Sequence, residues 1–203
     1  MQRVLFFDYD GVIADSLSTW YRVYKKISSK LGLPEINDKE ELRNLYDNNM
    51  YESLRKSGVN VNVAIKNIQD HLGKVYLKEV PVFSGMFSVV NNLSKKYPLF
   101  VITSNAFMVV QSHIEKNKLA GIRGVIGPEK ETSKVEKIKK IMLDFPGAEF
   151  WYIGDTTGDI KEGREAKVKT VAVTWGYHSK SKLTMVKPDF IVNNPEELFK
   201  LLS

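Results

Sequence analysis

Short apolar runs recur along this chain with helical patterns between them, and this alternation constrains the fold more than any other feature. The runs occupy residues 4–7, 99–103, 150–153, 170–173 and 190–192, with a weaker sixth run at 124–126. Most runs are continuous rather than alternating, which is typical of strands covered on both faces. Apolar residues at helical spacing, such as Val89, Val90 and Leu93, separate consecutive runs. The pattern predicts an α/β fold in which a doubly wound parallel sheet carries helices on both faces.

One interval breaks this alternation. Residues 16–80 show only helical periodicity, with apolar side chains such as Tyr24 and Ile27 one turn apart, and no convincing strand. We therefore expect an inserted, all-helical unit at 16–80. The sheet domain would then be formed by residues 1–15 together with 81–203.

Acidic side chains follow two of the predicted strands. Asp8 and Asp10 come directly after the first run, and Asp155 follows a later run with Asp159 four residues beyond it. Open parallel sheets bind ligands at the carboxyl ends of their strands, so these carboxylates are candidates for one site. Neighbouring carboxylates raise each other's pKa unless a cation neutralises them. A hard divalent ion, most naturally Mg²⁺, is therefore expected among them.

The apolar run at 99–103 ends differently, in Thr103-Ser104-Asn105. Hydroxyl groups, a side-chain amide and backbone N–H groups at the end of a strand can hold phosphoryl oxygens. The sequence therefore predicts an anion-binding turn beside the acidic residues.

Four segments together resemble a known family. Asp8-Tyr9-Asp10-Gly11-Val12-Ile13-Ala14-Asp15-Ser16 resembles the first motif of the haloacid dehalogenase (HAD) superfamily of hydrolases. Thr103 resembles the second motif, Lys134 the third, and Gly154-Asp155-Thr156-Thr157-Gly158-Asp159 the acidic fourth. The resemblance covers almost the whole chain and is strongest to phosphoglycolate-phosphatase-like members. It implies a HAD-like Rossmannoid core with a helical cap of the C1 type.

This resemblance implies a phosphatase, a Mg²⁺-dependent phosphomonoester hydrolase that acts on a small phosphorylated metabolite through an aspartyl-phosphate. Asp8 would be the nucleophile and Asp10 the general acid and base. Asp8, the backbone carbonyl of Asp10, and Asp155 would hold the metal. Asp159 would orient Lys134 or the ion from behind. The substrate phosphate would be bound by Thr103, Ser104, Asn105 and Lys134.

Two assignments stay open. Lys134 is not followed by the proline that the family often carries there, so Lys130 is the alternative lysine of that motif. Within the predicted cap, the stretch 46–51 could face the substrate, and Arg43 or Arg55 could reach a second anionic group.

Other functions share parts of this pattern. A phosphomutase of the β-phosphoglucomutase type uses the same pair, Asp8 and Asp10, and remains an alternative. A non-enzymatic phosphoacceptor of the receiver type also combines acids, Mg²⁺, a hydroxyl and a lysine, but it has no helical insertion after its first strand. A dehalogenase is disfavoured because that branch of the family lacks the second carboxylate that Asp10 supplies here.

The distribution of charge argues against nucleic acid as a partner. The chain has 30 basic and 24 acidic side chains, a formal charge of +6. Residues 16–80 hold eleven Lys or Arg against eight Asp or Glu, and the other residues hold nineteen against sixteen. The excess is thus shared evenly, and no basic arm or aromatic-basic stripe emerges.

Composition excludes further classes. With no cysteine, the chain forms no disulfide, thiolate zinc site or cysteine nucleophile. No segment approaches the roughly 20 consecutive apolar residues of a membrane span. The apolar residues before Asp8 are too few for a signal peptide. We therefore expect a cytoplasmic protein, monomeric or homodimeric, with no membrane partner.

Overall fold

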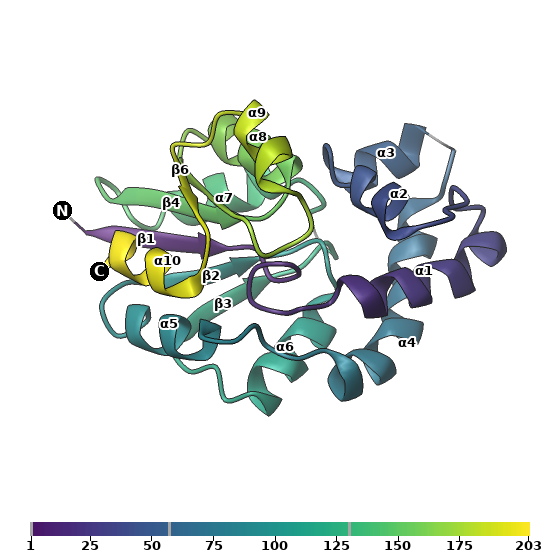
Figure 1. The fold of residues 1–203 in the computed structure, drawn as a ribbon, viewed down its shortest axis with the longest axis horizontal. Helices are drawn as coiled ribbons and strands as arrows, with labels where there is room; N and C mark the ends of the chain where they lie inside the picture. The colour runs from purple at the N-terminus through teal and green to yellow at the C-terminus, as the bar shows by residue number, and fades with distance from the viewer. Residues whose placement is uncertain (1, 57, 130) are drawn as a thin grey trace.

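The computed structural model describes residues 2–56, 58–129 and 131–203. Within these ranges the strands form one six-stranded sheet in the order β3-β2-β1-β4-β5-β6, and all neighbouring strands are parallel (Figure 1). The strands are β1 (Arg3–Phe7), β2 (Leu99–Ile102), β3 (Ile122–Ile126), β4 (Glu149–Gly154), β5 (Lys169–Val173) and β6 (Phe190–Val192). The predicted doubly wound parallel sheet is confirmed, and its weaker sixth candidate is β3.

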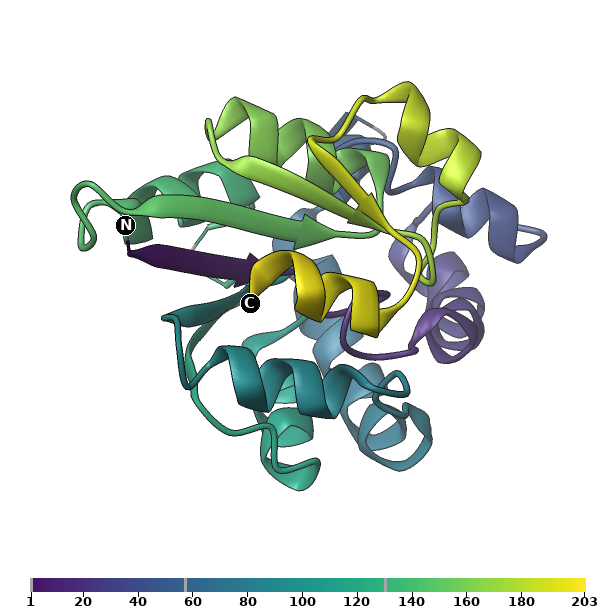
Figure 2. The ribbon, with the colours of Figure 1, turned by 60° about the vertical axis from the view of Figure 1, so that its left-hand side comes forward.

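Helices that connect or follow the strands cover both faces of the sheet. They are α5 (Met86–Leu93), α6 (Phe107–Lys116), α7 (Lys134–Met142), α8 (Thr157–Glu165), α9 (Lys180–Met185) and α10 (Pro195–Leu202). In Figure 2, α5 and α10 lie side by side on one face, while α7 and α8 lie on the opposite face. This arrangement leaves the carboxyl ends of the strands free to form a site.

The central strand β1 shows why its apolar run is continuous. Leu5 and Phe7 belong to the larger hydrophobic cluster, together with buried side chains of α5, whereas Val4 and Phe6 belong to a second cluster with side chains of α7. All four are fully buried. A strand covered on both faces needs an apolar side chain at every position, and this requirement removes the alternation of polar and apolar residues.

Four helices lie between β1 and α5 in the sequence. They are α1 (Leu17–Leu31), α2 (Lys39–Asn44), α3 (Met50–Lys56) and α4 (Val61–Glu79). Figure 1 shows them gathered beyond one end of the sheet. The described residues from 17 to 79 contain no strand, in agreement with the expected helical insertion. The division into separate domains at residues 16 and 80 remains a prediction.

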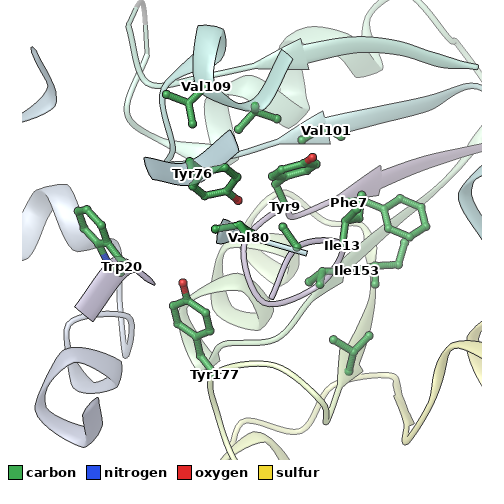
Figure 3. Close-up of a cluster of buried hydrophobic side chains, with 14 of the residues drawn as sticks. Phe7, Tyr9, Ile13, Trp20, Tyr76, Val80, Val101, Val109, Ile153 and Tyr177 are labelled. Atoms are coloured by element: carbon green, nitrogen blue, oxygen red, sulfur yellow. The ribbon is translucent and has the colours of Figure 1, made fainter. Parts of the chain in front are cut away.

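The inserted helices share one hydrophobic cluster with the sheet. Trp20 and Tyr76, from α1 and α4, belong to the same cluster as Phe7 and Ile153 of the central strands (Figure 3). Tyr9 belongs to this cluster too and directly precedes Asp10. Burial of apolar surface therefore holds the inserted helices against the end of the sheet where the acidic residues lie. Among the described residues, no helix has the length and apolar character that crossing a bilayer requires.

Candidate active site

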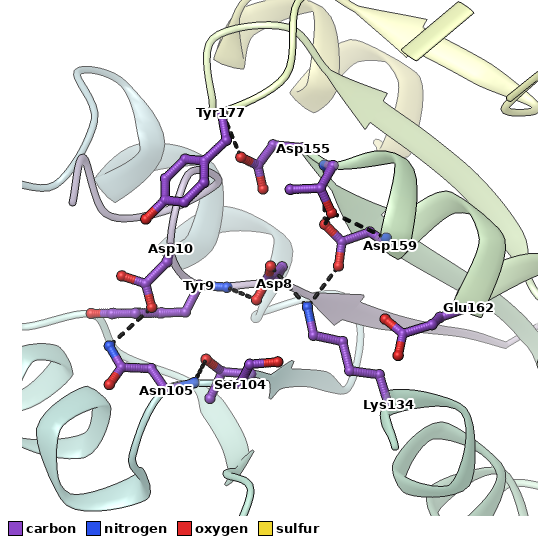
Figure 4. A network of polar contacts seen from close by, with 12 residues as sticks. Asp8, Tyr9, Asp10, Ser104, Asn105, Lys134, Asp155, Asp159, Glu162 and Tyr177 are labelled. Atoms are coloured by element: carbon purple, nitrogen blue, oxygen red, sulfur yellow. Dashed lines mark hydrogen bonds and ion pairs between the residues drawn. The ribbon is translucent and has the colours of Figure 1, made fainter. Parts of the chain in front are cut away.

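Strand register brings the first and fourth motifs together. β1 pairs with β4 so that Phe7 lies opposite Ile153, and the Asp8 N–H donates to the Ile153 carbonyl at 2.8 Å. Asp8 and Asp155 thus follow adjacent strand ends, as Figure 4 shows. Asp8, Asp155 and Asp159 are all buried, and one carboxylate oxygen of each lies within 4.8 Å of the others. Three buried carboxylates this close together form a candidate site for a cation.

Asp155 has one oxygen without a protein partner. Its Oδ2 accepts a hydrogen bond from the Tyr177 N–H at 2.6 Å, whereas its Oδ1 is buried and accepts none. Burial raises the pKa of Asp155 well above its usual value, and the nearby charges of Asp159 and Asp8 raise it further. A buried, unpartnered carboxylate oxygen beside two other carboxylates is what a site for a divalent cation requires.

Two glycines make room for the Asp155 carboxylate. A Cβ on Gly11 would lie 1.9 Å from Asp155 Oδ2, and a Cβ on Gly176 would lie 2.3 Å from the same atom. Gly11 also has a φ of +84°, a conformation that side chains other than glycine rarely adopt. The backbone therefore approaches this carboxylate more closely than any other residue type permits.

Asp159 is held by several hydrogen bonds beside the other two carboxylates. Its Oδ1 accepts from Lys134 Nζ at 2.6 Å and from the Tyr152 hydroxyl at 2.7 Å. Its Oδ2 accepts from the Thr156 hydroxyl at 2.7 Å. Burial raises the pKa of Asp159, but Lys134 and these hydrogen bonds outweigh burial and leave the pKa below its ordinary value. These contacts place Asp159 beside Lys134, where its carboxylate holds the ammonium in position.

Lys134 is a buried ammonium held between two carboxylates. It is the first residue of α7, directly after the N-cap Ser133, whose hydroxyl accepts from a backbone N–H of the first turn. Its Nζ lies 2.9 Å from Asp8 Oδ2 as well as contacting Asp159. Burial lowers the pKa of Lys134, but the two carboxylates raise it well above its usual value. The alternative third-motif residue, Lys130, lies outside the described residues.

Burial and the Lys134 ammonium have opposite effects on the pKa of Asp8. Burial raises the pKa of Asp8 to about 7, while the charge of Lys134 opposes the rise. Its Oδ1 accepts a hydrogen bond from the Tyr9 N–H at 2.7 Å. A bound cation would lower this pKa and favour the ionised, nucleophilic form.

Asp10 receives two hydrogen bonds from opposite sides. The Tyr76 hydroxyl on α4 donates to its Oδ1 at 2.6 Å, and the side-chain amide of Asn105 donates to its Oδ2 at 2.9 Å. Asn105 was expected to bind the substrate phosphate, and in this structure its amide is engaged with Asp10 instead. Sequence reasoning missed Tyr76 because it lies 66 residues from Asp10, inside a helical pattern that reads as core.

The end of β2 supplies the remaining predicted groups. Thr103 is buried, and its hydroxyl accepts from the Asn105 N–H at 2.9 Å, forming a tight turn around Ser104. The Ser104 carbonyl accepts from the Tyr51 hydroxyl of α3. The Thr103 carbonyl accepts from Lys137 Nζ at 2.8 Å. Lys137 is almost fully buried, and burial lowers its pKa to about 7. Lys137 therefore supports this turn from inside the fold.

A pocket opens where these groups meet the inserted helices. It is lined by Asp8, Asp10, Thr103, Ser104, Asn105, Lys134 and Thr156 from the sheet domain, and by Trp20, Tyr46, Met50, Tyr51, Leu72 and Tyr177 around them. Of the predicted cap residues, those of the stretch 46–51 that line it are Tyr46, Met50 and Tyr51. Arg43 and Arg55 do not line it. Arg43 contacts Glu40, and Arg55 donates to the Thr132 hydroxyl beside a separate groove.

The parallel sheet carries an aspartate pair, Asp8 and Asp10, directly after its strand β1. The family model described as haloacid dehalogenase-like hydrolase matches residues 5–173, and the chain belongs to this family. The family prediction is therefore confirmed.

Curated relatives and a solved structure agree with this assignment. The chain is 22% identical to a phosphoglycolate phosphatase of Synechococcus elongatus over 100% of this chain and 98% of that protein. It is 28% identical to pyrophosphatase PpaX of Bacillus mycoides over 61% of each chain. A predicted phosphatase from Clostridium acetobutylicum shares the fold with a TM-score of 0.83, at 22% identity over 100% of this chain and 98% of that one. Phosphatase is thus the enzyme class that the relatives indicate, as the sequence predicted.

Proposed function

We propose that this chain is a Mg²⁺-dependent phosphomonoester hydrolase that acts on a small phosphorylated metabolite through an aspartyl-phosphate on Asp8. The observation that carries the proposal is the placement of Asp8. Its carboxylate is buried 2.9 Å from Lys134 Nζ, close to Asp155, and it lines the pocket that Asp10 and Thr103 also line. An aspartate in such a position can act as a nucleophile toward phosphorus.

The residues present fit a divalent metal ion. Asp8, the backbone carbonyl of Asp10, and Asp155 would hold it, and the unpartnered Oδ1 of Asp155 supplies a ligand that no protein donor uses. When bound, Mg²⁺ would offset the repulsion between the anionic nucleophile and the anionic phosphate. Oxygen ligands of this kind suit a hard cation.

The protein groups divide the reaction into two steps. In the first, an Asp8 oxygen forms a bond to phosphorus while the bond from phosphorus to the leaving oxygen breaks, and Asp10 gives that oxygen a proton. In the second, Asp10 takes a proton from water as the water oxygen attacks phosphorus, and Asp8 is released with inorganic phosphate. Lys134 and Thr103 stabilise the charge on the other phosphoryl oxygens in both steps.

The inserted helices have a role in closing the site. We propose that residues 16–80 form a cap over a catalytic core made of residues 1–15 and 81–203. Trp20 and Tyr46, from the cap, line the same pocket as Asp8, so the closed arrangement excludes water from the nucleophile. A cytoplasmic location and a monomeric or homodimeric state remain predictions from the sequence.

Hydrolysis of 4-nitrophenyl phosphate tests the proposal. We expect turnover that requires Mg²⁺, stops with a chelator, and falls about a thousandfold or more in Asp8→Asn, because the amide is not a nucleophile. Asp15→Asn is the matched control, since Asp15 belongs to the same segment but is exposed and does not line the pocket. An Asp8→Asn protein as active as the parent would overturn the proposal. Release of inorganic phosphate, without transfer to a second hydroxyl, distinguishes hydrolysis from mutase activity.

A further inference from the structure

The wall of the pocket that faces the phosphate site is apolar and aromatic. Its side chains come from the inserted helices, from the loops beside them, and from the loop after β5, and they are Trp20, Tyr46, Met50, Tyr51, Leu72 and Tyr177. Apart from the half-buried Tyr46, each of them is buried. In the proposed function the substrate phosphate lies against Asp8, Thr103 and Lys134, so the alcohol part of the substrate would lie against this wall.

Positive charge is scarce in this pocket. Among the described residues that line it, Lys134 is the one cation, and its ammonium already contacts the carboxylates of Asp8 and Asp159. Asp10 adds a further acidic group on the leaving-group side. A second anionic group on the substrate would therefore be buried without a counter-charge, which is costly.

Most polar atoms of the wall are already in use. The Tyr51 hydroxyl donates to the Ser104 carbonyl, and the Tyr177 hydroxyl is hydrogen-bonded to Ser16 Oγ at 3.0 Å. Two polar groups of the wall remain: the Trp20 indole N–H, which is buried and has no acceptor at hydrogen-bonding geometry, and the Tyr46 hydroxyl beside it. Burial raises the pKa of the Tyr46 hydroxyl, and the nearby Trp20 N–H opposes this rise to a small extent. A neutral oxygen on the substrate would give this N–H the acceptor it lacks.

Building on the proposed phosphatase function, we propose that the preferred substrate is the phosphate monoester of a small uncharged alcohol. Its leaving group carries no carboxylate and no second phosphate, and a neutral oxygen on it accepts a hydrogen bond from Trp20. The substrates in the names of two relatives, phosphoglycolate and pyrophosphate, both have a second anionic group on the leaving side. This chain is therefore expected to discriminate against both.

A matched pair of substrates tests charge alone. Phosphoglycolate and phosphoglycolamide have nearly the same size and differ in a carboxylate against a neutral amide. We expect kcat/KM for the amide to exceed that for the carboxylate by about tenfold or more, because the carboxylate would be buried unpaired. Equal values, or a preference for phosphoglycolate, would overturn the inference.

Two variants at Met50 test whether the missing cation is the cause. Met50→Lys places an ammonium in the wall and should shift the kcat/KM ratio toward phosphoglycolate by about tenfold. Met50→Gln, which is of similar size and neutral, should leave the ratio near that of the parent protein. A Met50→Lys protein with an unchanged ratio, in a fold that circular dichroism shows to be intact, would contradict the charge argument.

Trp20→Phe tests the indole N–H. This variant keeps an aromatic wall and should lower kcat/KM for phosphoglycolamide about threefold to tenfold, the effect of one neutral hydrogen bond. Phenyl phosphate has no oxygen other than those of its phosphate, so its turnover should not respond in the same way. An equal loss with both substrates would refute the assigned hydrogen bond.

These outcomes separate the inference from the proposed function. If no phosphate ester is turned over in the presence of Mg²⁺, the proposed function fails and the inference fails with it. If phenyl phosphate is hydrolysed in an Asp8-dependent reaction but phosphoglycolate exceeds its amide, the function stands and the inference alone is wrong.

Discussion

Two positions approach Asp155 so closely that only glycine fits there. Gly11 and Gly176 both face its Oδ2, and Gly11 lies in the left-handed region of backbone conformation. A positive φ and a lack of space for a Cβ are separate reasons for a glycine, and Gly147 shows only the first of them. Gly147 has a φ of +77° and no atom within 4 Å of the position of a Cβ.

The comparison of Gly11→Ala with Gly147→Ala separates the two effects. Gly147→Ala should lower the free energy of unfolding by about 1 to 2 kcal/mol, the cost of a left-handed alanine. Gly11→Ala should lower the free energy of unfolding by more than this. It should also abolish the Mg²⁺-dependent activity, because its Cβ would displace the Asp155 carboxylate. Denaturant unfolding measures both variants. Equal losses of stability would show that crowding at Asp155 is unimportant.

At the residue scale, the sequence predicts the position of a residue where that position follows from the order of the chain. Asp8 and Asp155 could be placed near each other because each follows an apolar run that forms a strand. Tyr76 and Lys137 could not, since their roles depend on which turn of a packed helix faces the site. Lys137 lies three residues after Lys134, on the same face of α7, and this spacing is the one signal that could have indicated its burial.

At the scale of elements, hydrogen bonds at the start of α8 hold Asp159 of the acidic motif 154–159 in place. The Thr156 hydroxyl accepts from the Asp159 N–H at 3.1 Å, and the Asp159 carboxylate accepts from the Thr156 N–H at 3.1 Å. This reciprocal capping box satisfies backbone donors that a helix start leaves free. It also fixes the carboxylate that holds Lys134.

Thr156→Ala should therefore lower both stability and activity. Loss of an N-cap of this kind costs about 1 to 2 kcal/mol in the free energy of unfolding. We also expect kcat to fall, because Asp159 loses one of the partners that orient it toward Lys134. Thr156→Ser is the control, since it keeps the hydroxyl and should retain most of both properties. Thermal unfolding and steady-state kinetics measure the two effects, and an alanine variant identical to the serine variant would contradict this role.

Elements were predictable from the sequence to different degrees. The strands were found because a buried parallel strand leaves a continuous apolar run, as in Val4 to Phe7. The inserted helices α2 and α3 were not resolved individually, because they have only 6 and 7 residues and carry too few apolar positions for a periodic pattern. Their packing depends on contacts with the rest of the chain, such as that between Tyr51 and Ser104.

For the molecule as a whole, stability depends on protons that buried carboxylates hold in the folded state. The pKa of Asp8 rises from 3.8 to about 7 on folding because of burial, and burial also raises that of Asp155. Between about pH 4 and 7, these groups hold more protons in the folded than in the unfolded chain. Their contribution to the free energy of unfolding therefore falls as pH rises through this window.

If the proposed function holds, Mg²⁺ should reverse this loss, because it would bind the deprotonated carboxylates. The rise in Tm that Mg²⁺ produces should be larger near pH 8 than near pH 5.5. For each proton that binding releases, the apparent affinity for Mg²⁺ should weaken about tenfold per pH unit below about 7. Asp155→Asn should remove most of the Mg²⁺ effect at both values. An equal rise in Tm at both pH values would show that the metal does not displace protons from this site.

The central position of β1 has a further consequence, which concerns the order in which the protein is made. β1 ends at Phe7, but its partner strands begin at Leu99 and Glu149. At a ribosomal rate of about 5 to 20 residues per second, this apolar strand waits roughly 7 to 30 s for its second neighbour. Helices α1 and α4, translated in the interval, pack against each other and can cover their own apolar faces. β1 shares a hydrophobic cluster with both helices through Phe7, but it gains its strand neighbours only later, and Asp8 acquires its surroundings only after Asp155 has left the ribosome.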